Sequence, residues 1–290
     1  MTDPLDQLVG LLDLEQIEVN LFRGFSPGER TMRVFGGQVL GQALVAASRT
    51  VEGRDAHSLH GYFLRPGDPK IPIIYDVDRI RDGKSFTTRR VNGIQHGKAI
   101  FSMSVSFQIH EEGFSHQSTM PDVPPPEDLK TEYELRADIL DEIPERFRSW
   151  FARERPVEIR PVNPYHPTRP PVRDASKHVW FKARHTLPDE PSIHKCVLAY
   201  ASDMSLLETS LGPHGLGFMT PNIQMASLDH AMWFHRPFKA DEWMLYTQDS
   251  PSASGARGFN RGEIYSRDGL LVASVTQEGL TRLHEDKEME

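Results

Sequence analysis

Cysteine is nearly absent from this sequence, which has a single one, Cys196, in 290 residues. One thiol cannot form an internal disulfide, and it leaves no partner for a CxxC redox or zinc motif. A disulfide framework of the secreted type is therefore excluded, and we expect a cytoplasmic protein. The opening residues agree, because they are acidic and lack the basic start and cleavage pattern of a secretory signal.

Positive charge and long apolar runs are also scarce. Lys and Arg number 33 against 41 Asp and Glu, which gives a net charge of -8. Contact with a phosphate backbone needs a clustered excess of cations, so we expect no nucleic-acid partner. The longest uncharged apolar stretch, residues 34–48, includes two glutamines and is shorter than the ~20 residues of a membrane-spanning helix. We therefore expect no membrane span.

Motifs for nucleotides and metals are missing as well. The chain has no Walker-type loop and no G-x-G-x-x-G after a predicted strand. The pairs His57 with His60 and His230 with His235 are not in a recognisable ligand motif with a supporting carboxylate. We predict that the protein holds no metal and uses no cofactor.

Two apparent nucleophiles can be set aside. Residues 24–28 match the pattern G-x-S-x-G, but Pro27 follows the serine and has no N–H to donate to an oxyanion. We interpret this segment as a loop. Cys196 has apolar neighbours on a predicted helix, which favours a buried structural thiol over a catalytic one.

The order of predicted elements indicates a folded chain with a buried helix and an antiparallel sheet. Hydrophobic residues make up 38% and charged residues 26%, as in globular proteins. A short amphipathic helix begins near Pro4, and residues 35–51 predict a helix that is apolar on nearly every side. The following segments alternate or are rich in β-branched residues, and they predict strands over 57–66, 71–80, 86–94 and 99–108.

The same order returns in the second half of the chain. Prolines gather between residues 109 and 177, around a predicted helix near 129–153 that connects the halves. A strand over 179–187, a helix over 193–212 and four strands then follow, over 224–237, 242–250, 256–266 and 270–280. Phe63, Arg65, Pro66, Tyr75 and Arg90 recur 171 residues later as Phe234, Arg236, Pro237, Tyr246 and Arg261. We interpret the halves as diverged copies of one unit.

Three polar residues interrupt apolar surfaces of the second half. Asp203 has apolar or aromatic neighbours three and four residues away on its predicted helix, and an ionised carboxylate there needs polar partners. The alternative for Asp203 is a local kink or an exposed face. Gln277 lies in an apolar row of its strand. Ser227 also has apolar neighbours on its side of a predicted strand, and its hydroxyl could meet both other groups.

Alignment of the halves strengthens this interpretation. The positions opposite Asp203, Ser227 and Gln277 in the first half are apolar, and they hold Val45, Ala56 and Val105. This asymmetry indicates that one half keeps a polar site while the other serves as scaffold and as the remaining wall of the pocket.

The chain resembles the type II acyl-CoA thioesterases, the double-hotdog family, over essentially its whole length. The segments that carry the resemblance are VFGGQVLGQAL, HSLHGYFLRPGD, PIIYDVDRIRDGKSF, YASD, ASLDHAMWFHRPF, ARGFNRGEIY and SVTQEG. The resemblance implies an α+β double hotdog, with two repeats of a long central helix wrapped by a curved antiparallel β-sheet. It places an N-terminal hotdog at 1–110, a linker region at 111–155 and a C-terminal hotdog with the catalytic residues at 156–290.

The family's catalytic residues are an aspartate, a threonine or serine, and a glutamine, which correspond to Asp203, Ser227 and Gln277. The resemblance implies hydrolysis of medium- to long-chain fatty acyl-CoA to free fatty acid and CoA by direct activation of a water. Coenzyme A is then part of the substrate. Serine retains the hydroxyl of threonine and loses only a methyl group that restricts its rotamer, so we expect activity.

Further expectations concern the substrate and assembly. The backbone N–H groups of Gly36, Gly37 and Gln38 are our choice for oxyanion donors, and His57 for a substrate contact. The resemblance also implies a homo-oligomer, a dimer or tetramer. Arg79, Arg81, Lys84, Arg89 and Arg90 offer charges for the CoA phosphates, but strand alternation favours a solvated face for them.

Two other functions stay open at this point. One is a noncatalytic acyl-CoA-binding protein. The other is a hotdog hydratase or dehydratase acting on acyl thioesters, for which Asp229 and His230 offer an acid and a histidine.

Overall fold

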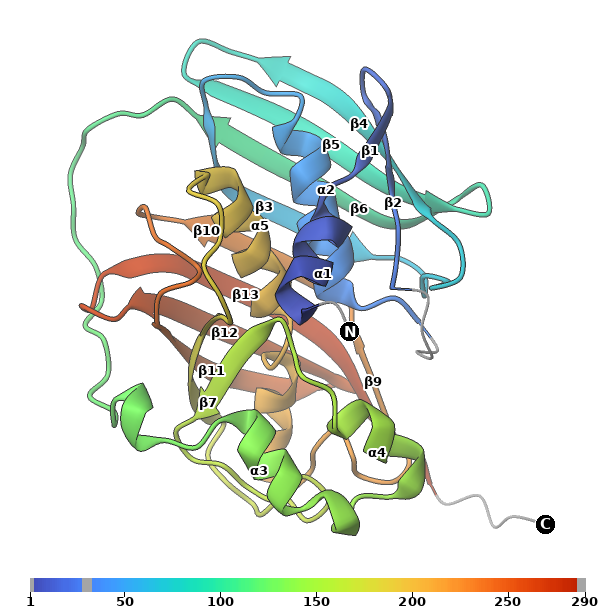
Figure 1. Ribbon diagram of the computed structural model, residues 1–290, viewed down its shortest axis with the longest axis vertical. Coiled ribbons are helices and arrows are strands. Elements are labelled where there is room, and N and C mark those ends of the chain that lie inside the picture. Colours follow the sequence, from blue (N-terminus) through green and yellow to red (C-terminus); the bar gives the residue numbers. More distant parts are fainter. Residues whose placement is uncertain (1–2, 28–32, 286–290) are drawn as a thin grey trace.

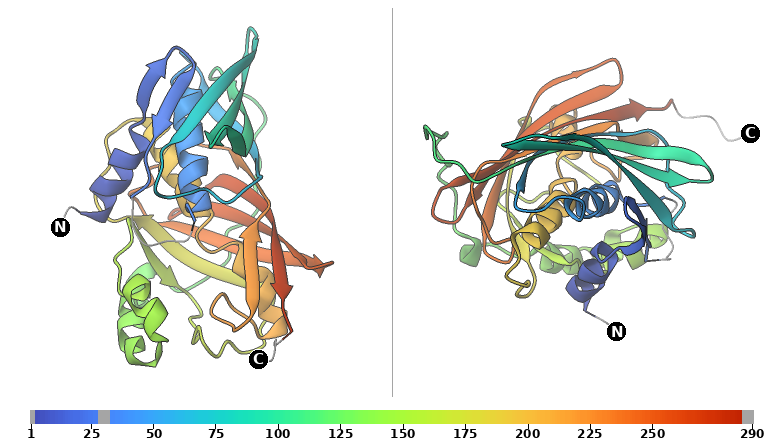
Figure 2. Two further views of the ribbon diagram at one scale, coloured as in Figure 1. Left: turned by 90° about the vertical axis from the view of Figure 1, so that its right-hand side faces the viewer. Right: turned by 90° about the horizontal axis from the view of Figure 1, so that it is seen from above.

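A computed structural model describes residues 3–27 and 33–285 of the chain. Its strands form a curved sheet, antiparallel in each pairing between the described strands. Two helices, α2 (Gly36–Ser48) and α5 (Pro191–Ser202), pack against each other on the concave face of this sheet (Figures 1 and 2). The architecture is the predicted α+β double hotdog.

Each half contributes its own run of strands to this sheet. The first half has β1 (Glu15–Glu18), β2 (Leu21–Gly24), β3 (Asp55–Phe63), β4 (Ile73–Asp82), β5 (Phe86–Gln95) and β6 (Lys98–Gln108). The second has β7 (Val157–Pro161), β8 (Ser176–Ala183), β9 (Ile223–Ser227), β10 (Asp229–Phe234), β11 (Met244–Ser254), β12 (Arg257–Ser266) and β13 (Leu271–Leu283). The halves join where β3 pairs with β10, with Gly61 opposite His230, so one sheet spans both.

The two central helices approach closely because α2 presents glycines to α5. A Cβ atom at Gly41 would lie 3.2 Å from the carbonyl oxygen of Cys196, and one at Gly37 would collide with the carbonyl oxygen of Tyr200. The remaining α2 residues are buried around most of the helix, as their composition predicts. A short first helix, α1 (Pro4–Leu12), covers α2 with its buried leucines.

The single connecting helix predicted near 129–153 is wrong. This segment holds two short helices, α3 (Glu132–Asp138) and α4 (Glu145–Phe151), with the 3-10 turn η2 (Leu140–Glu142) between them. Another 3-10 turn, η1 (Pro126–Asp128), lies directly before the segment. Pro144 lies between the helices and cannot continue one, because it has no N–H and its ring crowds the preceding turn. These helices lie at one end of the molecule, beside the second half (Figure 1).

The second central helix is shorter than the predicted 193–212. α5 ends at Ser202 with Asp203 as its C-cap, and the chain continues into a 3-10 segment, η3 (Leu207–His214). The predicted strand 224–237 is also divided, at Leu228, because the pairing with β13 shifts by one residue between Ser227 and Ala231. Both interruptions place a polar residue at the end of an element.

The described residues include no helix long and apolar enough to cross a membrane.

Candidate active site

The three polar residues singled out in the second half converge on one point. Asp203 follows the last turn of α5, Ser227 ends β9, and Gln277 lies in β13. Gln277 donates through Nε2 to Asp203 Oδ1 at 2.6 Å and to Ser227 Oγ at 3.0 Å. Ser227 Oγ in turn donates to Asp203 Oδ1 at 3.3 Å. The three side chains form a closed hydrogen-bond network, which we call the trio.

The first turn of α2 completes this network from the other half of the chain. The backbone N–H of Gly37 donates to the Asp203 carboxylate. A Cβ atom at Gly36 would lie 2.6 Å from Asp203 Oδ2 and 3.1 Å from the ring of Phe63, so only glycine leaves room here. Asp203 therefore lies between the C-terminal end of α5, whose dipole disfavours a negative charge, and the N-terminal end of α2, which favours it.

Opposing effects set the basicity of Asp203. Burial raises the pKa of its carboxyl from 3.8 to about 6, while hydrogen bonds from Gln277, Ser227 and Gly37 and the positive charge of Arg33 limit the rise. The carboxylate is mostly ionised near pH 7 yet is a stronger base than an exposed aspartate. A general base performs best when its pKa lies near the working pH.

Gln277 is oriented by its two hydrogen bonds. Its Nε2 faces Asp203 and Ser227, so its Oε1 points away as an acceptor. The side chain is fully buried, and Oε1 has no hydrogen-bond partner among residues 3–27 and 33–285. A buried acceptor of this kind normally has a partner. As an amide oxygen it can accept a hydrogen bond from a small donor such as water.

The predicted oxyanion donors lie at the start of α2. The first N–H groups of a helix have no acceptor within it, which leaves those of Gly36 and Gln38 available by position. Gly37 N–H is held by Asp203 instead. The side chain of Gln38 is buried and donates to the Phe25 carbonyl oxygen at 3.1 Å and to Ser26 Oγ at 3.0 Å, which ties the chain after β2 to α2.

His57 is placed away from the trio. Its Nε2 lies 2.8 Å from Ser106 Oγ, and its ring packs edge-on against Phe86 at 5.6 Å. Burial and the positive charge of Lys195 lower the pKa of its imidazole. These partners belong to β5, β6 and α5, and none belongs to the trio.

The rejected nucleophiles have structural contacts. Ser26 of the G-x-S-x-G match accepts the bond from Gln38, while Gly28 lies outside the described residues. Cys196 is buried in the hydrophobic core, and burial raises the pKa of its thiol to about 12. Within the part of the chain that the structure describes, no three His, Cys, Asp or Glu side chains gather to hold a metal ion.

Asp229 and His230 do not form the acid and histidine pair of a hydratase. Asp229 Oδ1 accepts from the backbone N–H of Glu278 at 2.6 Å, whereas His230 points into the core and lies 2.9 Å from Ser202 Oγ through Nε2. Burial lowers the pKa of His230 to about 3. Ser202 was not singled out from the sequence, although its position directly before Asp203 and opposite Leu44 of the first half was a usable signal.

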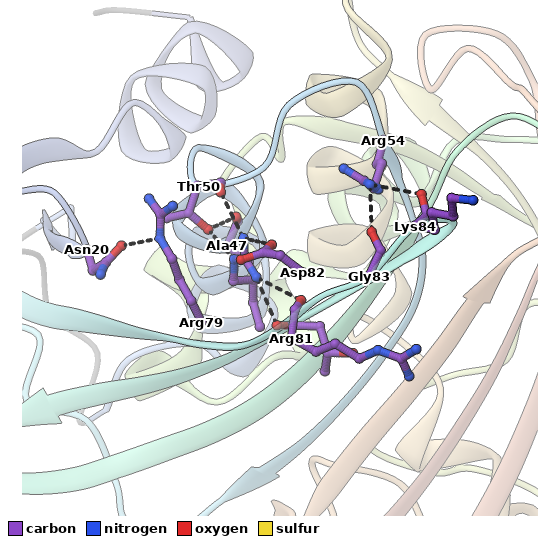
Figure 3. A network of polar contacts seen from close by, with 11 residues as sticks. Asn20, Ala47, Thr50, Arg54, Arg79, Arg81, Asp82, Gly83 and Lys84 are labelled. Atoms are coloured by element: carbon purple, nitrogen blue, oxygen red, sulfur yellow. Dashed lines mark hydrogen bonds and ion pairs between the residues drawn. The ribbon is translucent and has the colours of Figure 1, made fainter.

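Two residues of the cationic cluster considered for CoA phosphates, Arg79 and Arg89, donate to other side chains of the protein. Arg89 is 2% exposed and binds Asp82 Oδ1 at 2.6 Å and Thr50 Oγ1 at 2.9 Å. Arg54 donates to the carbonyl oxygens of Gly83 and Lys84, as Figure 3 shows. These bonds fasten the end of α2 to the β4–β5 hairpin. A helix of this length spans about 20 Å, so the cluster lies at the opposite end of α2 from Gly36.

Comparison with protein families finds two matching models. One, described as acyl-CoA thioesterase, matches residues 147–280, and the other, described as acyl-CoA thioesterase N-terminal domain, matches residues 26–108. Each model thus falls on one of the two halves.

Individual relatives match along nearly the full chain. The chain is 43% identical over 289 residues to acyl-CoA thioesterase 2 of Haemophilus influenzae, covering 98% of this chain and 100% of that protein. It is 44% identical over 286 residues to mouse acyl-coenzyme A thioesterase 8, covering 95% of this chain and 89% of the relative. A crystal structure of acyl-CoA thioesterase II TesB2 from Mycobacterium marinum aligns with a TM-score of 0.77 and 45% identity, covering 96% of this chain and 99% of the other.

Proposed function

The chain belongs to the acyl-CoA thioesterase family, and from that premise we propose that it hydrolyses acyl-CoA thioesters to a free fatty acid and coenzyme A. The observation that carries the proposal is the contact of Asp203 with Gln277 and Ser227. We assign these groups to a base and an oriented water, with the water rather than a side chain as the nucleophile.

In the proposed reaction Asp203 is the general base. Its carboxylate accepts a proton from a water while the water oxygen attacks the thioester carbonyl carbon, and the side chains of Ser227 and Gln277 orient that water. The resulting tetrahedral intermediate collapses by breaking the carbon–sulfur bond. A thiol with a pKa of roughly 8.5 is a good leaving group as thiolate, and it recovers the proton from Asp203. No covalent enzyme intermediate and no cofactor is required.

The developing oxyanion needs fixed donors close to the attacked carbon. We assign this role to the backbone N–H groups of Gly36 and Gln38 at the start of α2, where the helix dipole also favours negative charge. Gly37, included in the same prediction from sequence, acts through its bond to Asp203. His57 is retained as a candidate contact for a more distant part of the substrate.

The side chains around this end of α2 favour an aliphatic acyl group. Phe35 is partly exposed and packs edge-on against Tyr200 at 5.2 Å, and Phe63 lies beside Gly36. We propose medium- to long-chain fatty acyl-CoA as the substrate, because burial of each CH₂ group contributes about 0.8 kcal/mol of binding free energy. With this substrate the protein would act in fatty-acid metabolism.

We also propose a cytoplasmic homo-oligomer, a dimer or tetramer. A single buried thiol suits a reducing compartment. On the outer face of the sheet Tyr62 is 63% exposed beside the junction of the halves, and such exposed aromatic surface is typical of contacts between subunits. Light scattering after gel filtration tests the assembly, and a monomer at micromolar concentration would contradict it.

Free-thiol release from a series of acyl-CoA esters tests the proposed activity. We expect turnover that depends on chain length, with equal amounts of thiol and fatty acid formed. Binding of acyl-CoA without thiol release at any chain length would instead indicate a noncatalytic binding protein. A changed acyl chain still attached to CoA would indicate a hydratase.

A further inference from the structure

A buried pair of hydrogen-bonding side chains lies immediately next to Asp203. Ser202, the last residue of α5, has its Oγ 2.9 Å from His230 Nε2 and 2.9 Å from the carbonyl oxygen of Ala199. Both Ser202 and His230 are fully buried. Tyr246 adds a third contact, because its hydroxyl donates to the Ser202 carbonyl oxygen at 3.1 Å. Three side-chain bonds therefore hold one residue at the end of α5.

The number of hydrogen bonds that each tautomer of His230 can make indicates which atom is the donor. If His230 carries its proton on Nε2, it donates to Ser202 Oγ, and the serine hydroxyl donates to Ala199, which makes two hydrogen bonds. The other tautomer makes one, and it leaves a buried N–H at Nδ1 without a partner in the described part of the chain. His230 thus acts as a neutral donor, consistent with burial, which lowers its pKa to about 3.

The first half of the chain shows that this fold does not require a polar pair here. In the alignment of the halves Ser202 corresponds to Leu44 and His230 to Leu59, and both leucines are fully buried. Leu59 pairs across strands with Val105, the counterpart of Gln277. The half with apolar residues at the three trio positions therefore also has leucines at these two positions, and the half that carries the trio has the histidine and serine.

The location explains why such a pair is useful. The last carbonyl groups of a helix lack partners within it, and helix ends fray. Asp203 places a buried carboxylate at this end, where the helix dipole raises its free energy. Additional hydrogen bonds at this turn oppose fraying of the backbone that carries Asp203.

We propose that His230, through Ser202, positions the Asp203 carboxylate for catalysis. The pair does not touch the reacting atoms. It fixes the backbone from which Asp203 projects, so that the carboxylate meets Gln277 Nε2 and Gly37 N–H at the same time. This inference rests on the proposed function, because it assigns a role within that site.

The test compares His230→Leu, Ser202→Ala, their combination and His230→Gln in the full chain. We expect His230→Leu and Ser202→Ala each to lower kcat about 10- to 100-fold with little change in KM, because small displacements of a catalytic group have effects of this size. The combination should lose little more than either alone, since both act through one chain of bonds. His230→Gln keeps a donor near Nε2 and should restore most of the activity.

The pH profile separates positioning from a merely structural role. In His230→Leu the carboxylate loses part of its contact with Gln277, Ser227 and Gly37, which lower its pKa, while Arg33, Tyr200 and Tyr246 remain the other titratable neighbours that act on it electrostatically. The acidic limb of kcat against pH should therefore move to higher pH. Thr209→Val removes another buried hydrogen bond of this half, to Gln248 at 3.1 Å, and should leave the profile in place.

Folded His230→Leu and Ser202→Ala variants with unchanged kcat and pH profile would overturn the inference. If His230→Leu does not fold, Ser202→Ala alone decides the inference, by its kcat and by its pH profile. An unaltered protein that releases no thiol from any acyl-CoA would instead contradict the proposed function itself, so the two failures are distinguishable.

Discussion

Gln277 Nε2 lies 2.6 Å from Asp203 Oδ1, although the residues are 74 positions apart in the sequence. The donor comes from a strand and the acceptor from the end of a helix, so the contact exists only when the second half is folded. It determines how the carboxylate is oriented and limits the rise of its pKa.

The variant Gln277→Glu tests this contact with almost no change in shape. It replaces the donor with an oxygen and places a second carboxyl group against Asp203. Two carboxylates at this distance share a proton, which raises the pKa of the pair. We expect kcat near pH 7 to fall about 100-fold and the acidic limb to move to higher pH, measured as thiol release against pH. An unchanged profile would show that Gln277 does not act on Asp203.

The variant Gly36→Ala tests the close approach of α2 to the carboxylate. A methyl group at this position would lie 2.6 Å from Asp203 Oδ2, so the carboxylate or the helix must shift. We expect kcat to fall about 10- to 100-fold with a folded protein. Gly10→Ala in α1 is the matched control, because nothing lies within 4 Å of its new Cβ. It should leave kcat unchanged, and equal effects of the two variants would contradict our account.

Ser227 can be tested by keeping or removing its hydroxyl. Ser227→Thr retains the group that donates to Asp203 and accepts from Gln277, and we expect kcat within about threefold of the unaltered protein. Ser227→Ala removes both bonds and should lower kcat about 10- to 100-fold. The values of kcat for the two variants, measured side by side in steady-state assays, show whether the hydroxyl is required. Full activity of Ser227→Ala would remove the hydroxyl from the mechanism.

Asp203 should reduce the stability of the folded protein above its pKa. Because its pKa rises from 3.8 to about 6 on folding, the folded state binds more protons than the unfolded state between these values. Stability therefore falls as pH rises through this window, by up to about 3 kcal/mol. Asp203→Asn removes the effect and should be more stable than the unaltered protein near pH 7, but not near pH 4. Urea unfolding at both pH values measures this, and equal stability near pH 7 would contradict the raised pKa.

The sequence predicted the repeated helix and sheet well because their signals are local. The apolar composition of α2 and the alternation of apolar and polar residues in the strands correspond to the buried positions in the structure. The errors lie where tertiary contacts outweigh local preference, as at Asp203, where the predicted helix continues but the chain turns. Pro144 was visible in the sequence, yet the helical pattern on both sides of it masked the break.

Part of the candidate site could be predicted because its residues also leave a local signal in the sequence. Polar residues within apolar rows identified Asp203, Ser227 and Gln277, and the structure brings these three together. The bond from Gly37 and the pair of Ser202 with His230 could not be derived from spacing, because they join separate elements. The alignment of the halves did contain a sign of the pair, because Leu44 and Leu59 stand opposite Ser202 and His230.

In the proposed reaction Asp203 activates water for thioester hydrolysis. The most direct test measures thiol release from medium- and long-chain acyl-CoA esters by the unaltered protein and by Asp203→Asn, which has the same shape and no basic oxygen. We predict turnover by the unaltered protein and a loss of at least about 100-fold in kcat for the variant, with its circular dichroism spectrum unchanged. Equal activity of the two proteins would contradict the assignment of Asp203 as the base.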